Sequence, residues 1–595
     1  MKNFIKIIAL LLAALMVLTS CTLSENGKGS VTTENTTEIK TEQTTETPTE
    51  KATEKITEKP TEKVTEEPTE IETETPVEDE PQISEYRLKI SRTREELEAM
   101  LTLSDEDFVA LEEKLQAFKD IALVSDDYEA VDAIYVEFED MFYHIETQIS
   151  IASIIYYIDM SDEEASAKYL DAYGKYGDVY NEYIEVCKAV YENSPIRDQL
   201  FEDWTEEDIE ELYNYDPEMQ ELREKNEEIL VEINELTGPQ AYDRTAELYA
   251  QMVVNNNKLA VLCGYDNYYD YASVEIYGRD YTIEDIEAFG KLISKYYVEN
   301  HDEIYNGWYN DFSKLSNDDY YTMIDYLYEP FDSLDRNYLE GYILSYKNNS
   351  TAQGFFHMLN NRNIVFTDAE NSHPSAFQTY LTELETPFCL FGVNGQATSS
   401  VVHEMGHYYA ALYNPDVFSF DIAETQSQAN EMLLLEYLDG ALPAPVYKAV
   451  RGYSIYNFVV MSIVCVIIDE FERRVYTAEG VENFTSAEFD ALMKEVCENY
   501  GGIAFVNENI TPINQYWRSV ATNSPVYYIS YATSMTSSLN IFAEAETQRA
   551  AGRAIYKKLV EEIDENDGFL EAVEKAGLVS PFTEEAFEKI IALIK

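Results

Sequence analysis

Apolar residues recur at helical spacing through most of the chain after about residue 86. Ser104 is placed to cap a helix whose apolar face runs through Phe108, Leu111 and Leu115. Further amphipathic helices are predicted at 131–157, 163–191, 243–263, 282–297, 525–543, 547–566 and 583–594. The pattern therefore predicts a mainly α-helical protein.

The helical pattern is interrupted near residue 387. Residues 387–393 are a short β-like run, and Asn394-Gly395 closes it. The polar residues Thr398, Ser399 and Ser400 are each able to cap a helix that begins there. The strand is either an edge that could pair with an extended peptide or an ordinary part of a small sheet.

Residues 456–468 are strongly apolar, with Asn457 among them. A helix of about 13 residues is too short to cross a bilayer, so we expect a buried helix.

The first residues have the arrangement of a secretory signal peptide. Two lysines precede an apolar run at 7–18, which is too short to be read as a spanning helix. The run ends in Leu-Thr-Ser-Cys at 18–21, which resembles the bacterial lipoprotein box. We therefore expect residues 1–21 to be a lipoprotein signal peptide, with Cys21 acylated and anchoring the chain to the outer face of the cell membrane. An ordinary signal peptide with an unrelated Cys is the alternative.

Residues 22–85 are a low-complexity tract of Thr, Glu, Lys and Pro. Large apolar residues are almost absent from it, so no core offsets the entropy of ordering, and we expect a disordered, extended linker. A lipid anchor followed by such a linker indicates an extracytoplasmic protein of a Gram-positive bacterium. The rest divides into an N-terminal helical region, 86–205, and a region 206–595 that carries the candidate chemistry.

The charge of the chain argues against two classes of partner. A formal charge of −71 disfavours nucleic acid and anionic lipid surfaces. The cysteines other than Cys21 show no C-x-x-C spacing, so we expect buried thiols rather than disulfides or a thiolate metal site. These are Cys187, Cys263, Cys389, Cys465 and Cys497.

The candidate chemistry begins at 403–407, which reads His-Glu-x-x-His. On a helix His403 and His407 project from one face, so their imidazoles can bind one Zn²⁺ at about 2.0–2.1 Å each. Glu404 then lies beside the metal, where it can take a proton from a water molecule. Two unrelated histidines on a helix face, with a glutamate between them, would give the same pattern by chance.

A catalytic zinc needs a third protein ligand. No His follows His407, so this ligand is an acid or comes from upstream. Glu424 and Glu431 are seven residues apart and share a helix face. One of the two carboxylates can bind the metal, and the other can accept a hydrogen bond from a ligand imidazole.

The His-Glu-x-x-His motif and the two later glutamates resemble the oligoendopeptidase F and thimet oligopeptidase group of zinc peptidases. The segments 264–272, 377–381 and 387–395 are similar to that group too. The resemblance covers about 200–595 well and 86–200 loosely. It implies a large helical zincin-type peptidase with a deep channel for short unfolded peptides and a small β-sheet beside the active-site helix.

The resemblance also assigns roles. It implies one Zn²⁺ per chain, bound by His403, His407 and Glu424, and oligopeptides as substrates. Glu404 is then the general base and later the proton donor to the leaving amine, and Glu431 is the partner of a ligand imidazole.

The segment 524–533 matches the region in which that group places tyrosines that stabilise the oxyanion. Tyr528 or Tyr531 is the expected donor.

One segment departs from the family pattern. Members usually carry a His a few residues before the Pro at 525, and this chain has none there. Arg518 or Asn523 could compensate, and loss of one such donor costs on the order of 10²–10³ in rate. Among the remaining histidines, His373 has the best claim to a substrate contact, because it precedes the expected strand.

The sequence thus favours a membrane-tethered zinc endopeptidase acting on oligopeptides outside the cytoplasm. The alternative, motivated by the missing His, is a catalytically weakened peptide-binding lipoprotein. A purely structural surface protein would explain the linker but not the set of ligands.

Overall fold

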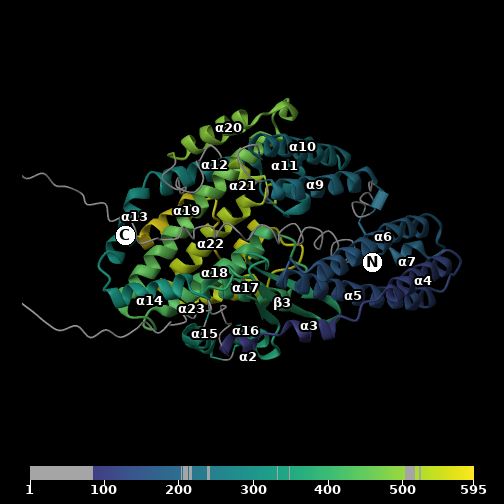
Figure 1. Ribbon diagram of the computed structural model, residues 1–595, viewed down its shortest axis with the longest axis horizontal. Coiled ribbons are helices and arrows are strands. Elements are labelled where there is room, and N and C mark those ends of the chain that lie inside the picture. Colours follow the sequence, from purple (N-terminus) through teal and green to yellow (C-terminus); the bar gives the residue numbers. More distant parts are fainter. Residues whose placement is uncertain are drawn as a thin grey trace, which may run out of the picture. The chain divides into compact units, whose positions relative to one another are not determined.

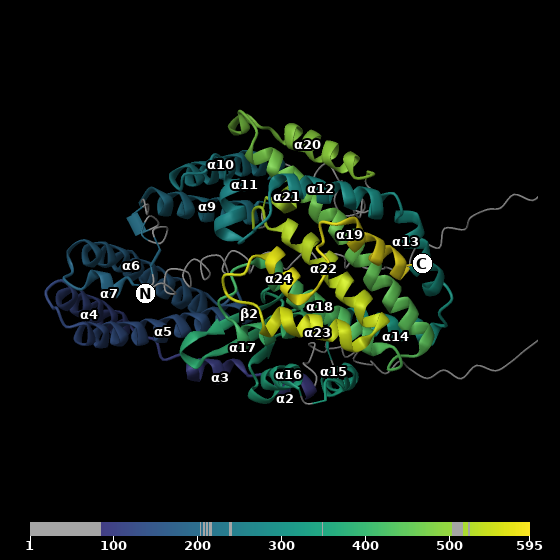
Figure 2. The same ribbon diagram turned by 180° about the vertical axis from the view of Figure 1, so that it is seen from behind.

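Helices make up most of the chain, as the hydrophobic pattern predicted, and Figures 1 and 2 show them from opposite sides. The computed structural model describes residues 85–202, 204–205, 209, 212–213, 217–236, 241–331, 333–347, 349–502, 516–521 and 524–594. The predicted signal peptide with Cys21, the linker up to residue 84, and Asn523 lie outside the described residues.

The N-terminal helices share a separate apolar core from Phe108 onward, whereas Ile90 and Leu97, which precede it, join other apolar clusters. These helices are α2 (Glu85–Ile90), α3 (Arg94–Met100), α4 (Asp105–Ala122), α5 (Tyr128–Ile158), α6 (Glu163–Asn193) and α7 (Arg197–Leu200). Ser104 caps α4 as predicted, and its backbone N–H donates to Asp107 at 2.8 Å. Phe138 of α5 stacks on Tyr183 of α6 with ring centroids 5.4 Å apart. The predicted domain boundary after residue 205 stays a prediction.

The helices before the sheet are α9 (Pro217–Glu235), α10 (Ala241–Leu262), α11 (Tyr268–Tyr271), the π-helix η2 (Ala272–Ile276), α12 (Ile283–Ile293), the π-helix η3 (Ser294–Val298), α13 (His301–Phe312), α14 (Asn317–Tyr328), α15 (Ser333–Ser345) and α16 (Ser350–Asn361). The helix predicted at 282–297 is thus α12 continued by one π-helical stretch.

The helices after the sheet are α17 (Thr398–Tyr413), α18 (Phe420–Leu438), α19 (Ala444–Tyr476), the 3-10 turn η5 (Val481–Asn483), α20 (Ser486–Asn499), α21 (Trp517–Val520), α22 (Tyr528–Thr547), α23 (Arg549–Glu561), α24 (Phe569–Ala576) and α25 (Glu584–Ile594). Helix α22 packs against both α18 and α19, and α17 packs against α18 (Figure 1). The His-Glu-x-x-His motif lies on α17, which also packs against two strands of the sheet.

The apolar run at 456–468 is the middle of α19, which is 33 residues long. By length and composition α19 could cross a membrane, but 72% of its most apolar window is buried inside the protein. Such burial is typical of a core helix. The sequence pattern showed only the apolar middle, because polar residues such as Arg451 and Asp469 flank it.

The sheet has three strands in the order β1 (Ile364–Phe366), β3 (Thr386–Phe391) and β2 (Ala376–Leu381), and the 3-10 turn η4 (Thr382–Leu384) leads from β2 to β3. Strand β1 is parallel to β3, and β2 is antiparallel to it. The strand predicted at 387–393 is therefore β3, paired on both sides, and the edge-strand interpretation is wrong. Its nearly continuous burial is typical of a central strand.

The side chains of β3 alternate between two layers. Phe388 and Leu390 join an apolar cluster with Ile151 and Ile155 of α5. Cys389 faces the other layer, where its thiol lies 3.8 Å from the backbone oxygen of Glu404 in α17. The sheet therefore lies between α5 and the helix that carries the motif (Figure 1).

Helix α17 begins without the predicted side-chain cap. Its N-cap residue is Ala397, and Thr398, Ser399 and Ser400 form the first helical residues. Thr398 is fully buried, so its side chain packs in the interior and does not cap the helix.

Candidate metal centre

Three side chains that the sequence singled out converge in the structure. Nε2 of His403 lies 3.5 Å from Oε2 of Glu424, and Nε2 of His407 lies 3.9 Å from the same oxygen. Donor atoms that bind one tetrahedral ion at 2.0–2.2 Å lie roughly 3.4 Å apart. Two imidazoles and one carboxylate, all within 4.8 Å of one another, therefore fit a divalent cation such as zinc.

Close packing of α17 on α18 brings these ligands together. A Cβ at Gly406 would lie 2.6 Å from the Cα of Ser427 and 2.7 Å from the carbonyl oxygen of Gln426, so only glycine fits there. The side-chain amide of Asn430 also donates to the carbonyl oxygen of Val402 at 2.7 Å. The two helices are thereby held at a spacing that places Glu424 opposite the histidines.

Glu431 holds the His403 ring, as the sequence predicted for one of the two glutamates. Nδ1 of His403 donates to Oε1 of Glu431 at 2.8 Å, which leaves Nε2 facing Glu424. Burial lowers the pKa of His403, but the hydrogen bond to Glu431 and the nearby carboxylates outweigh it and raise that pKa to about 9.

His407 has the opposite electrostatic environment. Burial, followed by the charge of His403, holds the pKa of His407 well below its ordinary value. A neutral imidazole offers a lone pair, which is the form that binds a metal ion.

The carboxylate of Glu424 is buried and oriented. Tyr527 donates a hydrogen bond to its Oε1, and the hydroxyl of Ser427 lies 3.2 Å from its Oε2. Burial raises the pKa of Glu424, and the charge of His403 and these hydrogen bonds oppose the rise. The oxygen nearest to the imidazoles is Oε2, so the orientation suits a metal ligand.

Glu404 follows His403 on α17 and is 3% exposed. It lies close enough to His403 for its charge to raise that residue's pKa. A carboxylate beside the ligands, with little solvent around it, suits proton transfer at this centre.

Among the tyrosines, the structure brings Tyr527 to the candidate ligand, whereas the sequence favoured Tyr528 or Tyr531. Tyr528 is completely buried in the first turn of α22. Tyr531 packs against Tyr527 with ring centroids 4.9 Å apart, so it lies one ring away from Glu424. Tyr527 stands at the N-cap of α22, and the turn before this helix decides which of the three tyrosines reaches Glu424. The sequence pattern does not reveal that turn.

The two other described candidates, His373 and Arg518, pack against aromatic rings. His373 is 4% exposed and makes edge-on contacts with Tyr157 and Phe377, so it packs beside the sheet instead of facing solvent. The guanidinium of Arg518 lies 4.9 Å from the ring centre of Tyr242.

The comparisons agree with this fold. Residues 100–212 match the family model of the Peptidase M3 N-terminal domain. No curated protein matches the chain.

Three solved structures are similar over most of their length. A candidate oligoendopeptidase F has a TM-score of 0.65 at 16% identity, covering 83% of this chain and 97% of that one. PZ peptidase A with an inhibitor has a TM-score of 0.62 at 16% identity, with coverages of 84% and 96%. A candidate oligoendopeptidase F from Bacillus anthracis has a TM-score of 0.62 at 16% identity, covering 82% of this chain and 95% of that one. These likenesses confirm the predicted large helical fold with its small sheet.

Proposed function

We propose that this chain, a metallopeptidase of the M3 type by its N-terminal domain and its fold, is a zinc-dependent endopeptidase that hydrolyses short oligopeptides. The observation that carries the proposal is the convergence of His403, His407 and Glu424 on one point, with Glu404 beside it. Two imidazoles and a carboxylate are the ligand set of many catalytic zinc sites, and they leave a position free for water or substrate.

In this proposal Glu404 moves the proton. A divalent ion held by the three ligands would polarise a water molecule and the scissile carbonyl group. Glu404 takes a proton from the attacking water and gives it to the leaving amine. Glu431 meanwhile keeps Nε2 of His403 turned toward the centre, because it binds Nδ1.

The oxyanion needs a hydrogen-bond donor about 3 Å away, worth a few kcal/mol. Tyr531 is the better of the two tyrosines proposed from the sequence, because its ring packs on Tyr527 at the centre and Tyr528 is completely buried.

The location of the reaction is proposed from sequence alone. The apolar run at 7–18 followed by Cys21 supports a lipid anchor on the outer face of the cell membrane, with 22–85 as the linker. The formal charge of −71 disfavours nucleic acids as ligands.

A catalytically weakened peptide-binding lipoprotein is the second candidate. It is favoured by the absence of a His before Pro525, where Arg518 lies against the Tyr242 ring.

A peptide assay separates the two candidates. The purified chain is analysed for bound metal and incubated with a diverse set of quenched fluorescent peptides, with and without a chelator. The endopeptidase cleaves some of them, and the chelator stops cleavage. Glu404→Gln keeps the metal and abolishes turnover, whereas the exposed Glu383→Gln serves as the control and stays active. Binding without chelator-sensitive cleavage of any peptide would favour the second candidate.

A further inference from the structure

We propose that Arg279 is a positioning residue for the candidate metal centre. Together with Asp421 it fixes the backbone at 525–527, so that the hydroxyl of Tyr527 holds Glu424 in the orientation of a metal ligand. The inference deepens the proposed function and rests on it, because it takes Glu424 to be a ligand.

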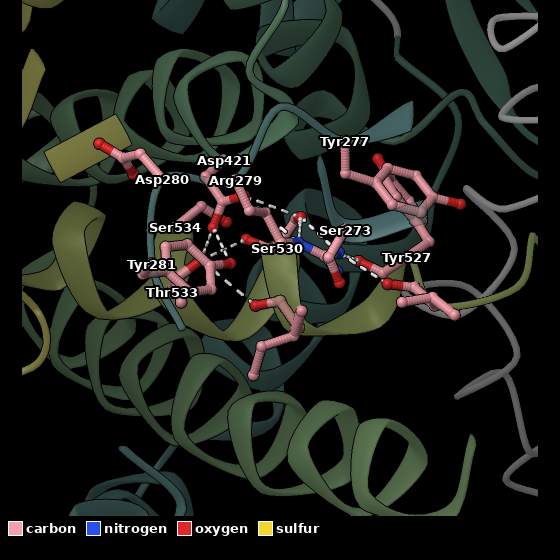
Figure 3. A network of polar contacts seen from close by, with 12 residues as sticks. Ser273, Tyr277, Arg279, Asp280, Tyr281, Asp421, Tyr527, Ser530, Thr533 and Ser534 are labelled. Atoms are coloured by element: carbon pink, nitrogen blue, oxygen red, sulfur yellow. Dashed lines mark hydrogen bonds and ion pairs between the residues drawn. The ribbon is translucent and has the colours of Figure 1, made fainter. Parts of the chain in front are cut away.

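Arg279 binds the turn that precedes α22 (Figure 3). Its Nη2 donates to the carbonyl oxygen of Val526 at 2.6 Å and lies 3.3 Å from that of Tyr527. The guanidinium also lies over the ring of Tyr277, whose hydroxyl donates to the carbonyl oxygen of Pro525 at 2.7 Å. Three successive carbonyl groups are therefore held by the segment between η2 and α12.

Asp421 ties the same cluster to α18 (Figure 3). It lies one turn before Glu424, and its carboxylate is 3.9 Å from Nε of Arg279, with both side chains fully buried. Tyr281 donates to Asp421 at 2.8 Å, and Thr533 of α22 donates to it as well. A buried ion pair with its hydrogen bonds satisfied gives a fixed arrangement rather than a loose contact.

Ser530 joins the two charged groups. Its hydroxyl accepts a hydrogen bond from Nη2 of Arg279 at 3.0 Å and donates one to Asp421 at 2.9 Å. The first turns of α18 and α22 are thus linked through one hydroxyl and one guanidinium.

Val526 shows that this turn is held in an unfavourable conformation. Its φ is +67°, a region that a β-branched residue rarely adopts. Such a conformation persists only where the surroundings impose it. Here the N–H of Val526 donates to Glu472 at 3.1 Å, and its carbonyl group accepts from Arg279. The peptide groups on both sides of the strained residue are therefore restrained.

The consequence of this turn is the place of Tyr527. Tyr527 directly follows the strained residue, and its ring packs against Phe420, Tyr277 and Tyr531. Its hydroxyl group donates a hydrogen bond to Oε1 of Glu424. With Oε1 bound, rotation of the carboxylate is restricted, and Oε2 stays toward the imidazoles. Partners of metal ligands typically contribute 10–100-fold to metal affinity.

The test measures zinc affinity by competition with a chromogenic chelator and the Tm of the metal-free protein. Tyr527→Phe removes only the hydroxyl and is expected to weaken zinc binding 10–100-fold, with little change in the metal-free Tm. Ser530→Ala removes the hydroxyl that joins Arg279 to Asp421 and is expected to weaken zinc binding several-fold. Ser538→Ala is the matched control, because Ser538 is equally buried on the same helix and has no bond to this cluster; it is expected to bind zinc as the wild type does.

Arg279→Gln shows whether Arg279 acts through Tyr527. If it does, the double variant with Tyr527→Phe binds zinc no more weakly than the weaker of the two single variants. Losses that multiply in the double variant would overturn that route, and unchanged zinc affinity in Tyr527→Phe or Ser530→Ala would overturn the inference.

Failure of the proposed function and failure of this inference give different results. A wild-type chain that binds no zinc would overturn both. A wild-type chain that binds zinc and cleaves peptides, with Tyr527→Phe unaltered in zinc affinity, would overturn only the positioning role. If Arg279→Gln fails to fold, Ser530→Ala against Ser538→Ala decides the question.

Discussion

Gly406 and Ser427 approach so closely that a Cβ on the glycine would lie 2.6 Å from the serine Cα. This contact sets the spacing between α17, which carries both histidines, and α18, which carries Glu424. Because the atoms in the way belong to the backbone, a side chain at Gly406 requires the helices to move.

Gly406→Ala is therefore expected to weaken zinc binding at least tenfold and to lower stability by about 1–3 kcal/mol, the usual cost of an overpacked core. Chelator competition and thermal unfolding measure the two effects. Gly174→Ala on α6 is the control, since no atom lies within 4 Å of its added Cβ. That variant is expected to gain about 0.5–1 kcal/mol from lower backbone entropy of the unfolded chain. Unchanged zinc affinity in Gly406→Ala would show that helix spacing does not govern the centre.

Glu431→Gln is expected to lower zinc affinity 10–100-fold, because it removes the negative charge that accepts the hydrogen bond from His403. The fold should be kept, because glutamine has nearly the same shape as glutamate. Glu431→Ala is expected to lose more, since nothing then binds Nδ1. The measurement is zinc competition with each variant. Equal affinities for both variants and the wild type would remove Glu431 from the centre.

Zinc is expected to stabilise the folded chain. A ligand that binds only the folded state adds about 2.7 kcal/mol at a free concentration of 100 times its Kd. The Tm should rise with zinc concentration and fall when a chelator is added. His407→Gln removes one ligand and should lose this dependence, whereas His144→Gln, which changes a half-exposed histidine beside Glu383, should keep it. A Tm that does not respond to zinc in the wild type would contradict the assigned site.

The stability of the chain should also depend on Glu472, a buried carboxyl group next to the strained turn. Burial raises the pKa of Glu472 to about 8, and the N–H of Val526 only partly offsets this effect. Because the folded pKa lies above the unfolded value, the favourable contribution of the protonated group is complete below about pH 4.5 and is lost as the pH rises to about 8.

Glu472→Gln mimics the protonated group and should remove this loss. Its Tm relative to the wild type is expected to rise between pH 5.5 and 8, corresponding to about 1.4 kcal/mol per pH unit, and to level off above pH 8. Thermal unfolding of the two proteins at matched pH measures the difference. A difference that stays constant with pH would show that Glu472 is ionised throughout.

The sequence was sufficient for the parts of the site that helix geometry determines. His403 and His407 share a face because they are four residues apart, and Glu431 reaches His403 because it lies two turns beyond Glu424. The resemblance to zinc peptidases then chose Glu424 as the third ligand, and the structure places it opposite the imidazoles.

Other features depend on distant parts of the chain and left no local pattern. Tyr527 reaches Glu424 because Val526 adopts a positive φ, and valine gives no sign of this. Arg279, which holds that turn, lies far away in sequence, and its neighbourhood carries no recognisable motif. The sequence pattern left open whether β3 is an edge strand or part of a small sheet, because its partner β1 is only three residues long and gives no clear strand pattern of its own.

The sheet between α5 and α17 also bears on the order in which the chain can fold. Ile151 and Ile155 lie in the first third of the sequence, and their cover, Phe388 and Leu390, is synthesised much later. Until then the nascent helix exposes apolar side chains that favour aggregation. Contacts between segments so far apart in sequence also form slowly. A newly synthesised chain is therefore expected to depend on chaperones, or on rapid completion of translation, to avoid aggregation.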